Sequence, residues 1–166
     1  MIDIVIDEMH KADSNEVDDP LPAAENIRQA VKAACIEAGF SHEPDLCIRF
    51  SDDETVAALN SLWRKKEGVT DIISFPMQEG PDFSPDESLG DMILATPFTI
   101  KESARLSIPT ADHMLHLIIH GTLHLLGYDH INDDEAEVMH RHEQAAMKKL
   151  GLHNPYPDED EDRNDV

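Results

Sequence analysis

The chain has 166 residues, 40% of them hydrophobic, which is enough to bury the core of one domain. Acidic residues outnumber basic ones by 35 to 13, giving a formal net charge of −22; this argues against a general binder of nucleic-acid backbones, which needs a basic face. No apolar run reaches the roughly 18 residues that span a bilayer, and the two cysteines form no CxxC pair. We therefore expect a protein of the reducing cytoplasm with no membrane partner.

The first third of the chain predicts a strand, an acidic loop and a helix. The opening MIDIVIDEMH alternates apolar and acidic residues, which favours a strand over residues 2–6 rather than a signal peptide. Residues 12–19 are mostly polar or acidic and indicate a solvated loop. A helix is expected over about 23–38, because its apolar residues share one face and Gly39 follows as a terminator.

A second strand and helix follow. Residues 45–50 alternate in polarity and predict a strand with one apolar side. Ser51, with Glu54 three residues later, forms a predicted capping box that opens a helix running to about Lys66. The side chains expected to point inward from this helix are Val56, Leu59, Leu62 and Trp63.

The remaining elements are predicted as strands over 70–75 and 89–95 and helices over about 97–106, 111–126 and 133–150. Four short strands interleaved with helices, followed by helices alone, indicate an α+β fold: a single layered domain with a four-stranded mixed sheet and about five helices. We expect this domain to cover residues 1–154 and the acidic residues 155–166 to form a disordered tail.

The stretch HGTLHLLGYDH contains three histidines at metal-ligand spacing. His120 and His124 are one helical turn apart on one face, so their rings can converge on one ion. Gly127 can adopt the left-handed conformation that ends a helix, which lets His130 return as a third ligand. Three imidazoles leave a fourth position open, which is the catalytic arrangement for zinc.

The helix that carries these histidines is apolar almost all round, so we expect it to be the central buried helix of the fold. His116 extends the histidine stripe and is expected to support a ligand or lie in the core, with a role as fourth ligand left open. Asp129 is a candidate acceptor for a ligand imidazole. The histidines expected at the surface are His113, His140, His142 and His153.

The same spacing occurs in the metzincin pattern HExxHxxGxxH. Metalloproteases of that kind use the glutamate as general base, whereas this chain has Gly121 at that position. Loss of the base would remove roughly 10²–10⁴-fold of catalysis, so peptide hydrolysis is disfavoured.

HGTLHLLGYDH strongly resembles the signature of the YbeY family of bacterial rRNA-maturation endoribonucleases. Three further stretches are similar to segments of that family, in the same order: LNSLWRKKEGVTDIISFP (59–76), LGDMIL (89–94) and HLIIHG (116–121). The resemblance covers most of residues 45–130. It departs from the family pattern at Trp63, where an aromatic such as tyrosine is usual, and at Ile72–Ile73, where the family has Val-Leu.

The resemblance implies a metal-dependent, single-strand-specific endoribonuclease in 16S rRNA 3′-end processing, ribosome maturation and quality control. It implies one zinc ion on His120, His124 and His130, replaceable by other divalent ions in recombinant protein, and Arg64 near the metal in the substrate cleft. The implied partners are single-stranded rRNA and the small ribosomal subunit or its assembly factors, with no DNA.

Arg64, Lys65 and Lys66 form the densest basic cluster of the chain. They are candidate phosphate contacts, because phosphodiester cleavage builds negative charge that a metal and a guanidinium can stabilise. The alternative is a solvated helix end whose cations complement the helix dipole. Two other functions stay open: a zinc metallohydrolase of another substrate class, and a ribosome-assembly binding protein with a structural metal. The nucleophile is also open, between water activated by the metal and the RNA 2′-OH.

Overall fold

The computed structural model describes residues 1–7 and 20–158. The predicted acidic loop over 12–19 and residues 159–166 of the predicted tail lie outside the described residues. The elements are β1 (Ile2–Ile6), α1 (Ala24–Glu37), β2 (Leu46–Ser51), α2 (Asp53–Arg64), β3 (Ile72–Pro76), β4 (Gly90–Ala95), α3 (Thr96–Leu106), α4 (Thr110–Leu125) and α5 (Asp133–Lys149). The predicted α+β class is confirmed, and each predicted strand and helix has its counterpart.

The four strands form one mixed sheet in the order β1-β2-β4-β3. β1, β2 and β4 are parallel, and β3 pairs with β4 in the antiparallel sense at the edge. Gly90 opens β4 with φ +139°, and a Cβ there would lie 2.2 Å from the carbonyl oxygen of Phe75. Glycine is therefore needed where β3 and β4 first meet.

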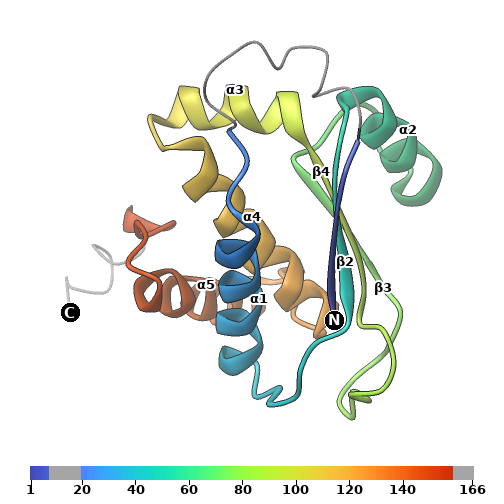
Figure 1. The fold of residues 1–166 in the computed structure, drawn as a ribbon, viewed down its shortest axis with the longest axis vertical. Helices are drawn as coiled ribbons and strands as arrows, with labels where there is room; N and C mark the ends of the chain where they lie inside the picture. Colours follow the sequence, from blue (N-terminus) through green and yellow to red (C-terminus); the bar gives the residue numbers. More distant parts are fainter. Residues whose placement is uncertain (8–19, 159–166) are drawn as a thin grey trace.

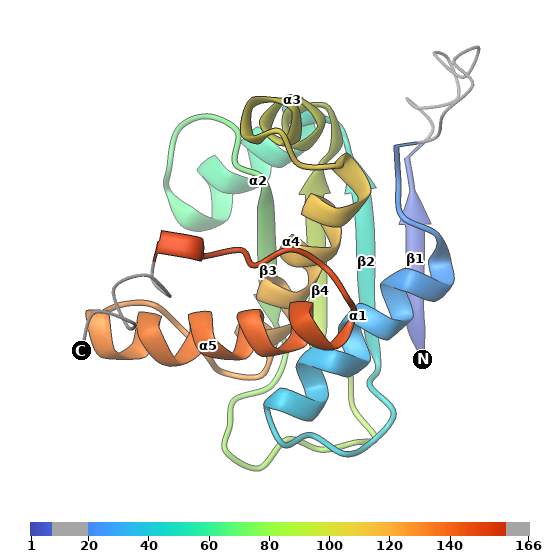
Figure 2. The same ribbon diagram turned by 90° about the vertical axis from the view of Figure 1, so that its left-hand side faces the viewer.

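The helices cover the two faces of the sheet unequally. α1, α4 and α5 lie on one side of the sheet and α2 on the other (Figure 1). Viewed from the helical side, α5 runs across the front of α4 (Figure 2), and α5 also contacts α1. The main core fills the space between the sheet and these helices, and a smaller one of Val56, Ile73, Ile93 and Ala95 lies under α2.

The predicted central buried helix is α4. All leucines and isoleucines from position 115 to the C-cap of α4 are buried: Leu115, Leu117, Ile118, Ile119, Leu123, Leu125 and Leu126. Gly121 lets α4 approach the sheet closely, because a Cβ at this position would lie 2.4 Å from the sulfur of Met92 on β4. The position that holds glutamate in the metalloprotease pattern thus faces the sheet, and a side chain there would fit only if Met92 moved.

Two predictions for α2 were wrong. Ser51 ends β2, where its hydroxyl donates a hydrogen bond to Asp7 at 2.7 Å. The N-cap is Asp52, whose carboxylate accepts a hydrogen bond from the backbone N–H of Thr55 at 2.6 Å. Ser and Asp are both common N-cap residues, and because β2 extends through Ser51, Asp52 takes the cap.

Leu62 and Trp63 were predicted to point inward, but they are 71% and 66% exposed. α2 is an amphipathic helix that packs on β3 and β4 through Val56 and the half-buried Leu59, which lie nearer its start. Its last turn reaches only the edge of this smaller core, so Leu62 and Trp63 stay mostly exposed although the apolar periodicity continues. Within the described residues, the structure contains no helix whose length and hydropathy suit a bilayer.

Leu125→Asp is expected to unfold the protein. Leu125 is 0% exposed, and burying an unpaired carboxylate costs several kcal/mol, comparable with a typical total stability of about 5–15 kcal/mol. Leu62→Asp is the matched control, because Leu62 is 71% exposed and should tolerate the same change. Thermal melts of both variants test this, and an unchanged melting temperature for Leu125→Asp would contradict the central role of α4.

Candidate metal centre

The three predicted histidines converge at the C-terminal end of α4. One ring nitrogen from each of His120, His124 and His130 lies within 4.8 Å of the others. The Nε2 atoms of His120 and His124 are 3.0 Å apart. Across residues 1–7 and 20–158, this is the one group of three or more histidine, cysteine or acidic side chains close enough to share an ion.

The turn after α4 brings His130 to the other two ligands. Gly127 has φ +94°, and the backbone N–H of Tyr128 donates to the carbonyl of Leu123 at 3.0 Å. The Gly127 N–H donates to the carbonyl of His124, also at 3.0 Å. A left-handed glycine with these bonds is a helix C-cap that reverses the chain, as the sequence predicted.

The hydrogen bonds of the two helical ligands fix their tautomers. His120 Nδ1 donates to a carboxylate oxygen of Glu143, and His124 Nδ1 donates to the carbonyl of Tyr128, each at 2.9 Å. When both rings are neutral, the proton of each is on Nδ1, so the Nε2 lone pairs of His120 and His124 point toward each other. A cation bound to both nitrogens would stabilise this arrangement. Burial, followed by the charges of His120 and His130, lowers the pKa of His124 to about 4. His124 is thus neutral at pH 7, as metal binding requires.

Glu143 on α5 joins the histidine cluster, and the sequence analysis missed it. Its side chain is 0% exposed and accepts hydrogen bonds from His120, from His116 Nε2 at 2.9 Å, and from the Tyr156 hydroxyl at 3.0 Å. Burial alone would raise its pKa, but the hydrogen bonds and charges of His116 and His120 outweigh burial and lower the pKa to about 2. The carboxylate is therefore ionised and holds His120 with Nε2 toward the ligand cluster.

The sequence contains a signal for Glu143. The buried positions of α5 are Met139, Glu143, Ala146 and Met147. Their spacing is that of one helical face, so a carboxylate lies in the middle of an apolar stripe. A buried carboxylate of this kind requires partners, which here are the histidines of α4.

His116 and Asp129, the two residues predicted to support the site, both lie near the three histidines but make different contacts. His116 contacts the same carboxylate as His120 and so joins the network one turn earlier on α4. The carboxylate of Asp129 accepts a hydrogen bond from the backbone N–H of His130 at 2.8 Å. Asp129 thus shapes the turn, and Glu143 and the Tyr128 carbonyl are the acceptors that contact ligand rings.

The expectation that four other histidines lie at the surface was wrong for His113, which is 7% exposed on α4. Burial and the nearby His116 lower its pKa. The other three are half-buried. His140 stacks on Tyr156 with ring centroids 3.8 Å apart, and His142 lies 3.2 Å from a carboxylate oxygen of Glu37.

The three histidines line a cavity of about 1090 Å³ that the end of α2 and residues 70–80 also line. Arg64 and Lys66 line this cavity as well, whereas Lys65 does not; Lys65 is the C-cap of α2, with φ 56°. The buried Asn60 holds this helix end, since its amide donates to the Gly68 carbonyl at 3.0 Å. Two of the three predicted basic residues thus share a cavity with the histidines.

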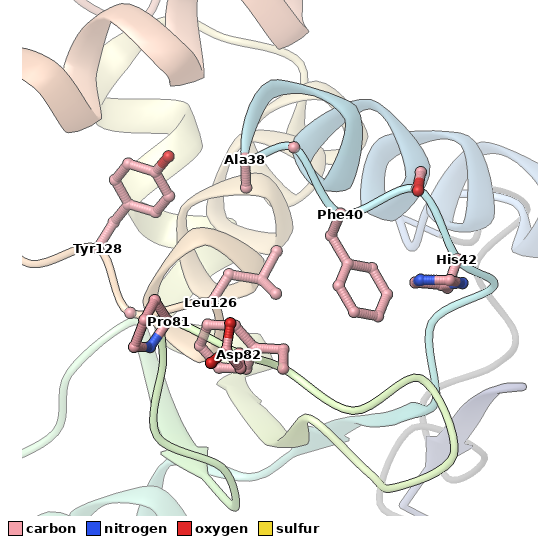
Figure 3. A pocket seen from close by; sticks show the side chains of 11 residues that line it. Ala38, Phe40, His42, Pro81, Asp82, Leu126 and Tyr128 are labelled. Carbon is pink, nitrogen blue, oxygen red and sulfur yellow. The ribbon is translucent and has the colours of Figure 1, made fainter.

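A second cavity of about 470 Å³ adjoins the first, and Gly127 and Tyr128 line both. Figure 3 shows Tyr128 at one end of this second cavity and Phe40 and His42 toward the other. The turn that positions His130 therefore separates two cavities, and the Arg64 side chain lines only the one that contains the ligands.

Alanine substitution of His120, His124 or His130 should each sharply reduce the bound divalent metal, because each removes one of three ligands. Metal content per chain, measured by elemental analysis after dialysis, checks this. His42→Ala is the matched control, since His42 lines the neighbouring cavity and not the ligand cavity. Full metal occupancy in all three ligand variants would refute the three-histidine site.

Glu143→Gln should lower metal affinity about 10- to 100-fold, because the neutral amide no longer fixes the His120 ring as a charged acceptor does. Competition with a chromophoric chelator measures the affinity. Glu137→Gln is the control on the same helix, because Glu137 is at the surface and pairs with Arg141. Equal affinities for both variants would show that Glu143 does not support the site.

Comparisons with known proteins agree with this geometry. The family model described as "Endoribonuclease YbeY" matches residues 8–151. A protein named Endoribonuclease YbeY from Rhizorhabdus wittichii is 47% identical over 78% of this chain and 80% of its own length. One of the same name from Zymomonas mobilis is 38% identical over 86% and 91%. A solution structure from Thermotoga maritima has the same fold, with a TM-score of 0.54 at 15% identity over 90% and 91%. The chain therefore belongs to the YbeY endoribonuclease family.

Proposed function

We propose that this protein is a zinc-dependent endoribonuclease that cuts single-stranded RNA in 16S rRNA 3′-end processing, ribosome maturation and quality control. The observation that carries the proposal is the shared cavity: three histidines able to hold one ion, and Arg64 with Lys66, line the same space. This combination suits a substrate whose reacting group is an anion. The relatives are named as endoribonucleases, which makes RNA the expected anion.

The chain's own residues supply most of the chemistry. A divalent ion held by the three histidines would supply Lewis acidity toward a phosphoryl oxygen. Arg64 can form a bidentate pair with the same phosphate and stabilise the charge that develops on its oxygens. Glu143 keeps the His120 ring oriented, and the carbonyl of Tyr128 does the same for His124.

Two observations disfavour the alternative functions. The chain has Gly121 at the position where a metzincin-type peptidase needs its glutamate base, and Gly121 faces Met92 of the sheet. A purely structural metal would be enclosed by protein, whereas His130 is exposed and all three histidines line an open cavity. The exposure of His130 and the open cavity favour a site that a substrate can reach.

The net charge of −22 bears on how RNA reaches the cavity. An envelope this acidic repels free RNA at a distance, because phosphate attraction needs a basic surface. The small basic rim at Arg64 and Lys66 acts only at short range. We therefore propose that the small ribosomal subunit or an assembly factor in the cytoplasm places the RNA at the cavity.

The direct test is incubation of metal-loaded, nuclease-free protein with rRNA precursors. Wild-type protein should cut single-stranded segments, and His124→Ala, prepared in parallel, should not. Equal cleavage by the two preparations would identify the activity as a contaminant and overturn the proposed function.

Arg64→Glu should abolish cleavage while the fold and the metal content persist, because Arg64 is exposed at the helix end and lines the cavity. Arg64→Lys should recover only part of the rate, since an ammonium group lacks the bidentate fork of a guanidinium. Melting temperature, bound metal and cleavage are measured on the same samples.

Arg28→Glu is the matched control for Arg64→Glu. It makes the same charge change at an exposed position of α1 that does not line the cavity. A metal-loaded, stable Arg64→Glu protein that cuts RNA at the wild-type rate would remove Arg64 from the site.

A further inference from the structure

Trp63 is the one tryptophan of the chain, and it is 66% exposed at the end of α2. It lines the same cavity as the three histidines and directly precedes Arg64. Singly exposed apolar side chains are common, but Trp63 lines a cavity together with the apolar Phe75 and Met77, and such a surface suits a ligand that covers the ring. The three-histidine site and the Arg64 clamp do not explain it.

The indole of Trp63 contacts one aromatic ring of the sheet. Its ring makes an edge-to-face contact with Phe75 of β3, with centroids 6.5 Å apart and an interplanar angle of 79°. Phe75 packs against the smaller core and therefore gives the indole a firm support. Most of the Trp63 surface remains open, so the ring is oriented in advance and can accept a flat partner at little entropic cost.

The neighbours of Trp63 indicate what that partner is. The cavity that Trp63 lines combines the apolar side chains of Phe75 and Met77 with the cations Arg64 and Lys66. It is also lined by three acidic side chains: Asp71, Glu79 and Asp129. Aromatic rings interleaved with cations fit single-stranded nucleic acid, whose bases stack on the rings while its phosphates pair with the cations. A base inside a duplex is stacked on both faces and paired along one edge, so it has no free face to offer.

We propose that Trp63 is a stacking platform for one nucleobase of a single-stranded RNA, and that the stack positions the adjoining phosphate at Arg64 and the histidines. The inference rests on the proposed endoribonuclease function. It assigns Trp63 as a positioning residue and gives a structural cause for single-strand preference, because only an unpaired base can cover the indole.

The single tryptophan makes the test specific, since all indole fluorescence comes from Trp63. Metal-loaded wild-type protein is mixed rapidly with a single-stranded oligoribonucleotide, its duplex, or an abasic strand of equal length, and fluorescence is read before cleavage. The single strand should quench Trp63 strongly, and the duplex and abasic strand should not. Equal quenching by the abasic strand, or none by the single strand, would overturn the proposal.

Substitution provides a second readout. Trp63→Ala should weaken single-strand binding by roughly 5- to 150-fold, the range expected for loss of one base–aromatic stack, with melting temperature and bound metal unchanged. Trp63→Phe should recover part of the affinity. Leu62→Ala is the matched control, because Leu62 is 71% exposed on the same turn but does not line the cavity.

Salt dependence distinguishes stacking from charge. Trp63→Ala should leave the slope of log affinity against log salt unchanged, whereas Arg64→Gln should reduce it by about 0.7 for one lost phosphate contact. Wild-type affinity in Trp63→Ala, with RNA cleavage intact, would overturn the stacking role alone and assign Trp63 to another surface, such as one for a protein partner. A wild-type protein that neither binds nor cuts RNA would overturn the proposed function itself.

Discussion

The structure of the site depends on one buried carboxylate. Glu143 is fully buried and ionised, a state that is costly unless donors surround it. Its donors come from two residues of α4, His116 and His120, and from Tyr156 beyond α5. The same hydrogen bonds therefore join α4, α5 and the segment after α5 and fix the His120 tautomer.

A second constraint is the close approach of α4 to the sheet. Gly121 faces Met92 of β4, and Ser74 of β3 donates to the Gly121 carbonyl at 3.4 Å. This contact places the histidines beside β3, whose residues form one wall of the cavity. The residue at this position is glycine, so the chain lacks the glutamate base of a protease here. The packing contact thus helps to set where the three histidines lie.

The sequence predicted the fold class, the elements and the histidine cluster because these depend on local patterns. Alternation predicts strands, and the spacing of His120 and His124 is a helical repeat. The partnership of Glu143 with His120 spans 23 residues, and no local pattern links the two. The apolar face of α5 contains the carboxylate of Glu143, but this pattern does not predict which residue the carboxylate contacts.

The prediction for the end of α2 failed for a different reason. Helical periodicity identifies residues that share a face, but it does not say how far the opposing surface extends. Trp63 lies on the apolar face predicted from sequence and at the edge of the smaller core. Trp63 was predicted to be buried, but it lines the cavity next to Arg64. There its exposed ring can contact a ligand.

The most direct test of this account is reconstitution of RNA cleavage from protein stripped of metal by a chelator. Zinc is added stepwise while cleavage of a single-stranded RNA and of its duplex is followed. The account predicts that single-strand cleavage rises from zero and saturates at one equivalent per chain, with the duplex left intact. Full cleavage by the metal-free protein, or saturation without any dependence on His120, His124 and His130, would contradict it.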